Sequence, residues 1–276
     1  MTAPAPGSLY IVSTPIGNLA DLSQRAIEIL KGAAIILAED TRHSRMLLMH
    51  FGITGRVDAY HEHNEAKATP KVIARLEAGD SVALISDAGT PLLSDPGARL
   101  VSGAIAAGIA VIPVPGASAL LAALVAGGLP ADRFTFFGFL ERKGKDRSSA
   151  IEDVAALRHT AVLYEAPGRV AALLGELADA GAGDRPAVVA RELTKQFEEF
   201  ARGTVAELAA RFADAAPRGE VVVLVAGAPD AVVDDAAVRA RAIALRAEGL
   251  SAREVARVLS IECGASRNLA YRIAHE

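Results

Sequence analysis

The stretch that decides the fold of this chain is Val82-Ala83-Leu84-Ile85-Ser86-Asp87-Ala88-Gly89-Thr90-Pro91-Leu92-Leu93-Ser94-Asp95-Pro96-Gly97. Its first four residues form a short apolar run that is typical of a buried parallel strand. A loop rich in Asp, Gly, Thr and Pro follows, and the turn Asp95-Pro96-Gly97 opens a helix. Open α/β sheets bind ligands where such a loop leaves the carboxyl end of a strand. The pattern therefore predicts a ligand site, although an ordinary turn between a strand and a helix fits it about equally well.

The charges of this loop indicate which ligand it suits. The loop carries two carboxylates, Asp87 and Asp95, and no Lys or Arg. A polyphosphate is held by backbone amides together with cations, so this composition disfavours it. A neutral or cationic ligand with hydroxyl groups fits the loop better.

The composition of the chain limits the classes of protein to which it can belong. A chain of 276 residues with 51% hydrophobic residues and a mean hydropathy of +0.29 has enough apolar residues for a large core and about two domains. The net charge of -4 and the pI near 5.9 exclude a general attraction to nucleic acid, so any RNA contact must be a local patch. The single cysteine, Cys263, excludes an internal disulfide and a cysteine-based metal cluster.

No charged residue occurs between Arg99 and Asp132, a length that could suggest a membrane helix. Prolines and glycines interrupt the run, which instead predicts a buried strand, a tight Pro-Gly turn and a buried helix. The amino terminus has no apolar region of the signal-peptide type. We therefore expect a cytoplasmic protein with no membrane association.

Strand, loop and helix alternate through the first part of the chain. The strands are predicted at residues 9–13, 34–38, 57–60 and 82–86. The turn at 14–18 is expected to have an unusual backbone, because Pro15 lacks an amide donor and Gly17 permits a positive φ. Helices are expected from Asp21 to Lys31, after a cap at Thr41, and from Thr69-Pro70 to Ala78.

Two polar clusters follow predicted strands in this part. Residues 39–45 place two acids, two arginines and a histidine at the same sheet edge as Asp87. The second cluster, His61-Glu62-His63-Asn64-Glu65, invites a zinc interpretation. Its histidines are only two residues apart and no third His or Cys follows, so we predict a substrate-facing loop and no metal.

The pattern changes near residues 115–120, where aromatic strands and hairpin-like spacing begin. We predict an α/β domain over 1–116, a second over 117–228 and a helical module over 229–276. In the second domain, strands are predicted at 134–139, 160–164, 186–190 and 219–227, with helices up to about Ala180 and from Gly203-Thr204. The basic loop 141–147 is either a mobile surface loop or a phosphate-contacting lid.

The tail is helical and rich in Ala and Arg. Ser251 and Glu254 form a predicted capping box, and residues 263–266 separate the last two helices. The spacing resembles a helix-turn-helix, but the segment is barely basic. A packing module or an RNA-accessory module is at least as well supported as a stand-alone DNA reader.

Six motifs in order resemble the tetrapyrrole-methylase-like S-adenosylmethionine enzymes, and more closely the branch that methylates the ribose 2'-hydroxyl of a cytidine in small-subunit (16S) ribosomal RNA. The resemblance covers nearly the whole chain. The motifs are Ser13-Thr14-Pro15-Ile16-Gly17-Asn18-Leu19, Glu39-Asp40-Thr41-Arg42, His61-Glu62-His63-Asn64-Glu65, Ser86-Asp87-Ala88-Gly89-Thr90-Pro91 with Ser94-Asp95-Pro96-Gly97, Pro115-Gly116-Ala117-Ser118-Ala119, and Arg191-Glu192-Leu193-Thr194-Lys195.

The resemblance implies two α/β domains of the tetrapyrrole-methylase type with S-adenosylmethionine in the cleft between them, a small C-terminal helical module, and a homodimer. It also implies the cofactor residues: Pro15 and Gly17 at the entrance, Asp87, Gly89 and Thr90 at the ribose and amino-acid portion beside Ser118 and Ala119, and Tyr164, Ala190 and Gly219 around the adenine. The implied partner is ribosomal RNA or the small ribosomal subunit.

Methyl transfer to a ribose hydroxyl needs a group that removes its proton or a cation that lowers its pKa. Our hypothesis assigns this to Lys195, with Glu39, Asp40 or Glu165 nearby, while a phosphate contact is an equally good role for Lys195. Substrate contacts are expected from Arg42, His61, Asn64, Glu65, Glu165 and Arg191. Three alternatives stay open: a porphyrinoid methyltransferase, a diphthamide-type methyltransferase, and a nucleic-acid-binding regulator that uses the C-terminal helices.

Overall fold

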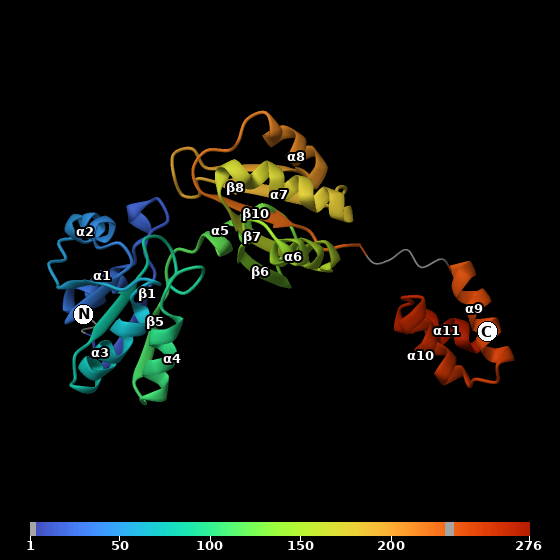
Figure 1. Ribbon diagram of the computed structural model, residues 1–276, viewed down its shortest axis with the longest axis horizontal. Helices are drawn as coiled ribbons and strands as arrows, with labels where there is room; N and C mark the ends of the chain where they lie inside the picture. The colour runs from blue at the N-terminus through green and yellow to red at the C-terminus, as the bar shows by residue number, and fades with distance from the viewer. Residues whose placement is uncertain (1–3, 230–234) are drawn as a thin grey trace. The chain divides into compact units, whose positions relative to one another are not determined.

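The computed structural model describes residues 4–229 and 235–276 (Figure 1). Its contacts divide the chain into two compact units, one up to Gly227 and one from Ala228 onward. The first unit contains two separate β-sheets. The predicted division of this unit at residues 116 and 117 stays a prediction.

The first sheet is parallel throughout and has the strand order β3-β2-β4-β1-β5, with β4 in the centre. Every residue of β2 and β4 is buried, as the apolar run at Val82 predicts. The strands are β1 (Ser8–Val12), β2 (Ile35–Ala38), β3 (Val57–Ala59), β4 (Val82–Ile85) and β5 (Ala110–Val114).

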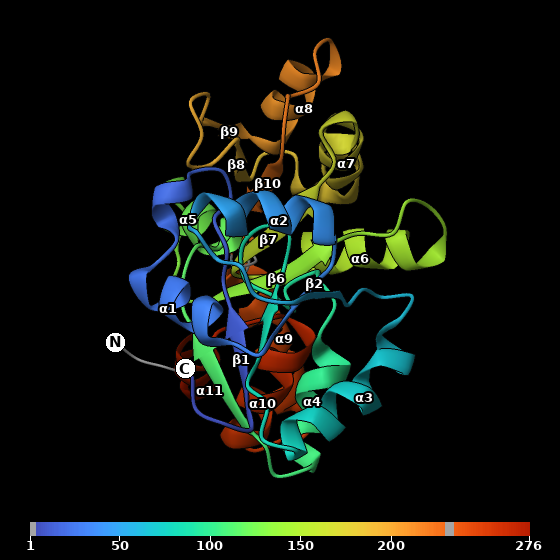
Figure 2. The same ribbon diagram turned by 90° about the vertical axis from the view of Figure 1, so that its left-hand side faces the viewer.

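Helices cover both faces of this sheet (Figure 2). Alternate residues of β2 divide between the faces, with Ile36 and Ala38 on one side and Ile35 and Leu37 on the other. The first face packs against α1 (Gln24–Gly32) and α2 (Thr41–His50), and the second against α3 (Glu65–Glu77) and α4 (Ala98–Ala106).

Three predicted helix starts are wrong. The first helix begins at Gln24 after an N-cap at Ser23, because residues 19–21 form a separate 3-10 turn. Asp40, not Thr41, caps α2, since its carboxylate accepts hydrogen bonds from the amides of Arg42 and His43. Helix α3 begins four residues before Thr69 and contains Pro70. Instead of capping, the Thr69 hydroxyl donates to the carbonyl of Glu65 at 2.7 Å, inside the helix.

The second sheet is mixed, with the order β6-β7-β10-β8-β9. Strands β6 and β7 are parallel, and the other pairs are antiparallel. Strand β9 was not predicted from the sequence, and its last two residues, Gly203 and Thr204, were expected to begin a helix. Arg, Gly and Glu obscure the alternation of this edge strand. The strands are β6 (Phe134–Phe139), β7 (Thr160–Glu165), β8 (Pro186–Arg191), β9 (Glu199–Thr204) and β10 (Val221–Val225).

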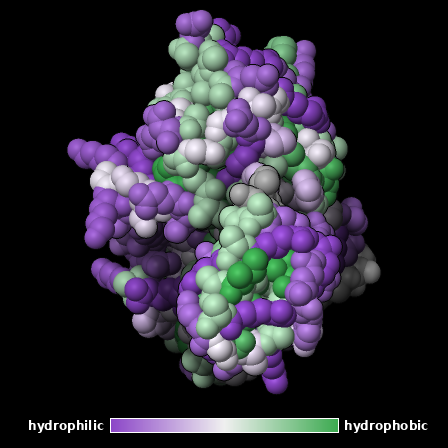
Figure 3. Space-filling model, turned by 90° about the vertical axis from the view of Figure 1, so that its right-hand side faces the viewer, coloured by the Kyte–Doolittle hydropathy of each residue, from purple (hydrophilic) through white to green (hydrophobic). Residues whose placement is uncertain are grey.

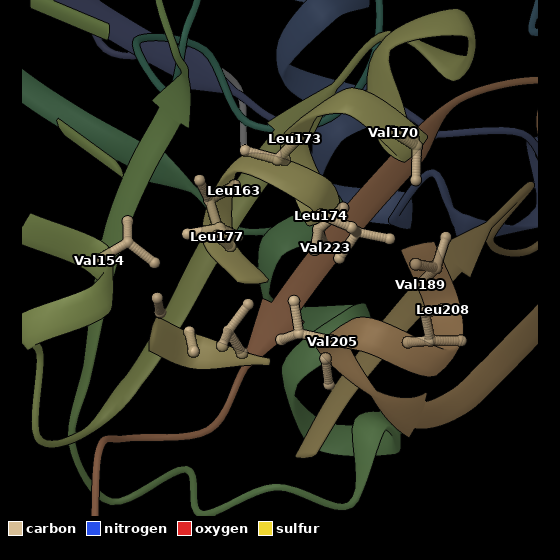
Figure 4. Close-up of a cluster of buried hydrophobic side chains, with 14 of the residues drawn as sticks. Val154, Leu163, Val170, Leu173, Leu174, Leu177, Val189, Val205, Leu208 and Val223 are labelled. Atoms are coloured by element: carbon tan, nitrogen blue, oxygen red, sulfur yellow. The ribbon is translucent and has the colours of Figure 1, made fainter. Parts of the chain in front are cut away.

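One face of this sheet packs against three helices in a large aliphatic core (Figure 4). They are α6 (Lys145–Ala156), α7 (Val170–Leu177), which continues as a π-helical turn to Ala182, and α8 (Val205–Ala213). The other face packs against α5 (Ala119–Gly127) together with Ile16 and Leu93 from the first part of the chain. The predicted strand, turn and helix within the uncharged run are present, but the expectation that the strand is buried is wrong. Strand β5 lies at the edge of the first sheet and buries only Val114, and α5 is buried on one side only, with Leu121 and Val125 exposed. Of the described helices, none has the length and apolar character needed to cross a membrane.

Arg147 does not belong to a mobile lid. Its side chain is buried, and its guanidinium donates to Glu176 at 2.7 Å and to the carbonyl of Glu141 at 2.9 Å. Helix α6 already begins at Lys145, so only residues 141–144 form the exposed loop.

The second unit consists of α9 (Asp235–Ala247), α10 (Ala252–Glu262) and α11 (Arg267–His275) around a core of its own. The predicted capping box at Ser251 and Glu254 is confirmed, and it starts α10. Several arginines of this unit pair with its acids, as Arg241 does with Glu262 at 2.9 Å. On the face drawn in Figure 3, apolar residues form a patch that hydrophilic residues surround.

Candidate active site

A cavity of about 390 Å³ lies in the first unit at the carboxyl ends of the parallel strands. The first sheet contributes residues that follow β1, β2 and β4, as expected for an open α/β sheet. The second sheet contributes residues around the end of β7 and the start of β10. The lining residues are Ile16, Glu39, Asp87, Ala88, Gly89, Thr90, Leu93, Ser94, Asp95, Ala119, Phe139, Tyr164, Glu165, Ala166, Pro167, Leu193, Gly219, Glu220, Val221 and Val222.

The loop after β4 is held in place by hydrogen bonds to neighbouring turns. Thr14 and Gly89 exchange two backbone hydrogen bonds of 2.8 and 3.0 Å. The Thr90 hydroxyl lies 3.1 Å from the Ser13 hydroxyl and donates to the carbonyl of Ala117 at 3.1 Å. These bonds fix the loop against the turns that follow β1 and β5.

Backbone strain is concentrated in two loops at the cavity. Among the described non-glycine residues, four have a positive φ: Leu92 and Ser94 after β4, and Glu192 and Thr194 after β8. Such conformations cost about 1–3 kcal/mol each and persist where the surrounding structure enforces them, commonly at functional sites. The two loops carry Asp95 and Lys195, respectively.

The charged residues of the cavity lining are all acidic. The lining contains five carboxylates and, in the part of the chain that the structure describes, no Lys, Arg or His. Two of the five have basic partners outside the lining: Glu165 pairs with Arg169 at 3.0 Å, and Glu220 pairs with Lys195 at 2.9 Å. The remaining carboxylates, Glu39, Asp87 and Asp95, form what we call the acidic triplet.

Burial and mutual repulsion shift the proton affinities of the acidic triplet. Burial, followed by the negative charge of Glu39, raises the pKa of Asp95 to about 6, although a hydrogen bond from Ser86 opposes the change. Burial and then the charge of Asp87 raise the pKa of Glu39 above its usual value. Asp87 accepts a hydrogen bond of 3.1 Å from the amide of Asp40.

An aromatic wall forms the second-sheet side of the cavity. The Tyr164 ring stands edge-on to Phe136 at 4.9 Å between ring centres and is tilted against Phe139 at 5.5 Å. The Tyr164 hydroxyl accepts a hydrogen bond of 3.2 Å from the amide of Leu120, in the first turn of α5. Burial is the main reason that the pKa of Tyr164 is raised.

Lys195 lies beside the cavity and is held by two carboxylates. Its Nζ donates to Glu192 at 2.8 Å and to Glu220 at 2.9 Å. Burial alone would lower the pKa of Lys195, but the hydrogen bonds and the charges of these two acids outweigh it and raise the pKa. Lys195 is therefore protonated in this arrangement, which favours a role as a cation over a role as a neutral base.

Gly17 has a different role from the one that its sequence context suggests. Its φ is not in the left-handed region, so the expectation of an unusual backbone there is wrong. A Cβ at this position would overlap the side chain of Lys195. Gly17 is therefore required for the close approach of Lys195.

The structure brings some of the predicted site residues together at the cavity. Of those predicted, the residues in the lining are Glu39, Asp87, Gly89, Thr90, Ala119, Tyr164, Glu165 and Gly219. The others are not in the lining, and their roles stay predictions: Pro15, Gly17, Asp40, Arg42, His61, Asn64, Glu65, Ser118, Ala190, Arg191 and Lys195.

Several of these side chains already have structural partners. Asn64 accepts a hydrogen bond of 3.0 Å from the amide of His61, and Arg191 pairs with Glu199 at 2.7 Å. Glu65 lies 3.7 Å from Arg99. By contrast, the Ser118 hydroxyl and Nδ1 of His61 are buried without a hydrogen-bond partner.

Asp95 and Glu220 line the cavity but were not among the predicted site residues. Asp95 was visible as the second acid of a loop predicted to bind a ligand. Glu220 had no such signal, because only the pairing of β10 with β8 brings it to Lys195. The described residues contain no group of three or more His, Cys, Asp or Glu side chains that could hold a metal ion.

A model of the family described as tetrapyrrole (corrin/porphyrin) methylases matches residues 8–209. The chain belongs to the tetrapyrrole methylase family. Three of its relatives carry the name ribosomal RNA small subunit methyltransferase I. The protein of Mesorhizobium japonicum is 48% identical over 98% of this chain and 92% of its own length. Those of Synechocystis and Escherichia coli O157:H7 are 43% and 42% identical over 98% of this chain and 98% and 95% of their own lengths.

The fold is shared with solved structures of other methyltransferases. A Thermus thermophilus uroporphyrin-III C-methyltransferase complexed with S-adenosylhomocysteine aligns with a TM-score of 0.58 at 20% identity. The alignment covers 79% of this chain and 97% of that one. A cobalt precorrin-4 methyltransferase aligns with a TM-score of 0.59 at 20% identity, over 80% of this chain and 95% of that one. The fold class predicted from the sequence is confirmed.

Proposed function

We propose that the chain is an S-adenosylmethionine-dependent methyltransferase that methylates the ribose 2'-hydroxyl of a cytidine in 16S ribosomal RNA. The observation that carries the proposal is the cavity with five carboxylates and no basic side chain in its described lining. A sulfonium ion is attracted to such a cavity, whereas a nucleoside triphosphate is repelled from it. The names of the relatives and the family membership support the substrate class.

The residues of the cavity fit the cofactor in other respects. The volume of about 390 Å³ lies in the range of small-molecule sites, and Tyr164 and Phe139 offer aromatic surface for an adenine. The unpartnered Ser118 hydroxyl adjoins Ala119, which lines the cavity. We propose that Asp87, Gly89 and Thr90 hold the ribose and amino-acid portion. Bound S-adenosylmethionine supplies an electrophilic methyl group on a sulfonium.

On the acceptor side, positioning of the hydroxyl supplies most of the rate. Protonated Lys195 offers a cation beside the cavity, where it can hold a ribose or phosphate oxygen. Glu39 lies in the lining, while Asp40 caps α2 with its carboxylate. Arg42 and residues 142–144 are exposed and follow Glu39 and Phe139, which line the cavity, by three to five residues, so they are candidates for contacts with RNA phosphates.

Two measurements test the proposal. Calorimetric titration of S-adenosylmethionine into the protein is expected to show binding, and no binding would favour the regulator that acts through the C-terminal helices. Nuclease mapping of small-subunit ribosomal RNA from cells without the gene is expected to reveal one unmethylated cytidine ribose. Fully methylated RNA in those cells would favour the porphyrinoid or diphthamide-type alternatives.

We also propose that the chain forms a homodimer. The uncharged run exposes large apolar side chains, with Ile105, Leu121 and Val125 at 64%, 51% and 77% exposure. Leu121 and Val125 are four residues apart on α5 and therefore share one face of this helix, and an exposed apolar face favours burial against another surface. Light scattering is expected to give twice the mass of the chain, and substitution of Leu121 and Val125 by Asp is expected to give the monomer mass.

A further inference from the structure

Asp95 differs from the other carboxylates of the cavity in its surroundings. It lies in the strained part of the loop after β4, next to Ser94, and the turn that follows uses Gly97 at a φ of 135°. The Ser94 hydroxyl lies so close to Gly138 of the second sheet that a Cβ there would be 2.9 Å away. The loop around Asp95 thus comes close to the second sheet, and Asp95 is one of the residues that line the cavity.

The groups that face Asp95 leave it without a basic partner. From the first sheet it faces Glu39 and Asp87, and from the second sheet it faces Tyr164. The other two acids in the lining, Glu165 and Glu220, are paired with Arg169 and Lys195. No ion pair of Asp95 occurs among the described residues. A cationic ligand in the cavity would therefore be the positive charge that the described residues do not supply to Asp95.

We propose that Asp95 is the catalytic base that takes the proton from the acceptor ribose hydroxyl. The inference rests on the proposed function and assigns the proton transfer of that reaction. The O–H bond breaks as the proton moves to the Asp95 carboxylate, and an electron pair of the oxygen forms the new O–CH₃ bond. The S–CH₃ bond breaks with its electron pair left on sulfur, so that a cationic sulfonium becomes a neutral thioether.

Asp95 has to be ionised before methyl transfer and protonated after it. The change of charge at sulfur explains both states. A bound sulfonium stabilises the ionised carboxylate, so that Asp95 is ready to accept a proton. Once the positive charge at sulfur is lost, Glu39 and Asp87 again oppose ionisation, and the proton stays on Asp95 until product leaves. The pKa of Asp95, about 6, lies close to neutral pH, where a general base works well.

Lys195 does not replace Asp95 in this role, because two carboxylates keep it protonated. Glu39 is the competing base, since it also lines the cavity. Asp95 and Glu39 can be distinguished by asking which of the two carboxylates must be ionised for the cofactor to bind. Binding that requires ionised Asp95 is weakened about elevenfold at pH 5, one unit below its pKa of about 6, because only about one molecule in eleven is ionised.

The test compares the binding of S-adenosylmethionine and S-adenosylhomocysteine between pH 5 and 7.5 by calorimetry in two buffers with different ionisation enthalpies. For the wild-type chain we expect S-adenosylmethionine affinity to fall about tenfold at pH 5, with proton release on binding, whereas S-adenosylhomocysteine affinity changes less. Asp95→Asn is expected to abolish both the pH dependence and the proton release, and to lower turnover at least about 100-fold. Asp95→Glu is expected to restore the proton release.

The control is Asp58→Asn, which removes a carboxylate that pairs with Arg56 outside the cavity. This variant is expected to keep the wild-type proton release on S-adenosylmethionine binding and the wild-type turnover. The assignment is overturned if Asp95→Asn keeps the proton release, or if Glu39→Gln alone removes it. Thermal unfolding shows whether each variant is folded, and Asp95→Glu provides a second variant if Asp95→Asn is not. A wild-type chain that binds no S-adenosylmethionine at pH 7.5 contradicts the proposed function, and this assignment with it.

Discussion

The side chain of Lys195 lies directly over Gly17, in the space that a Cβ of residue 17 would occupy. This contact connects the turn after β1 with the loop after β8, and thus the two sides of the cavity. Because the backbone of Gly17 has no positive φ, only the missing Cβ makes glycine necessary.

Gly17→Ala is therefore expected to displace Lys195 from Glu192 and Glu220 without unfolding the chain. A catalytic group moved by about 1 Å can cost about 100-fold in rate, and we expect a loss of turnover of that order. Methylation of small-subunit RNA measures it. Gly175→Ala is the matched control, because a Cβ there meets nothing within 4 Å. Unchanged turnover in Gly17→Ala would show that the position of Lys195 is unimportant.

Replacement of Lys195 itself separates catalysis from cofactor binding. Lys195→Ala is expected to abolish turnover while S-adenosylmethionine affinity stays within about threefold, because Lys195 is not part of the cavity lining. Lys195→Arg, which keeps the positive charge, is expected to retain part of the activity. If Lys195→Ala keeps full turnover, the proposed role of this residue is wrong.

The pH dependence of stability follows from Asp95. Its pKa is about 6 in the folded chain and 3.8 when unperturbed, so the folded state binds more protons between these values. Stability contributed by protonated Asp95 is therefore lost as pH rises from about 4 to 6. Asp95→Asn is expected to raise Tm by a few degrees at pH 7.5 and much less at pH 4.5. An equal gain at both pH values would contradict the shifted pKa.

Much of this site was predictable because it depends on local sequence. The strand–loop–helix pattern around Val82 located the loop that lines the cavity, and the two acids of this loop favoured a neutral or cationic ligand over a polyphosphate. Parallel strands end at a common edge, so Glu39 could be placed beside Asp87 without a structure. The capping boxes before α8 and α10 were also predictable, since they involve residues only three apart.

The remaining features depend on contacts between distant segments. The two acids that hold Lys195 come from positions 192 and 220, and no local pattern joins them. Arg147 looked like part of a basic surface loop, but tertiary packing buries it against Glu165 and Glu176. The edge strand β9 has little apolar alternation of its own, and β8 provides its register.

A buried arginine is expected to dominate the stability of the second sheet. Arg185 is 5% exposed, and its guanidinium donates to backbone carbonyls of Val154, Ala155 and Ala226. It has no carboxylate partner in the described part of the chain. Arg185→Met removes the guanidinium donors from these carbonyls, of which that of Val154 keeps a backbone hydrogen bond from Leu157 at 3.3 Å. We expect a loss of about 3–5 kcal/mol in the free energy of unfolding. Urea unfolding measures this, with the exposed Arg142→Met as the control. A loss below about 1 kcal/mol would show that water replaces the guanidinium.

The exposed residues Arg142 and Lys143 follow Phe139, which lines the cavity, and they provide a test of RNA binding at its rim. Replacement of both residues by Glu is expected to weaken binding of small-subunit RNA. The slope of the logarithm of the binding constant against the logarithm of the salt concentration is expected to become less steep by about one unit for each lost phosphate contact. Fluorescence anisotropy at several salt concentrations measures the slope. Reversal of the exposed Lys67 and Lys71 on α3 gives the same change in net charge and serves as the control. If the two double variants lose the same affinity and slope, the effect is one of net charge, and RNA does not bind at this loop.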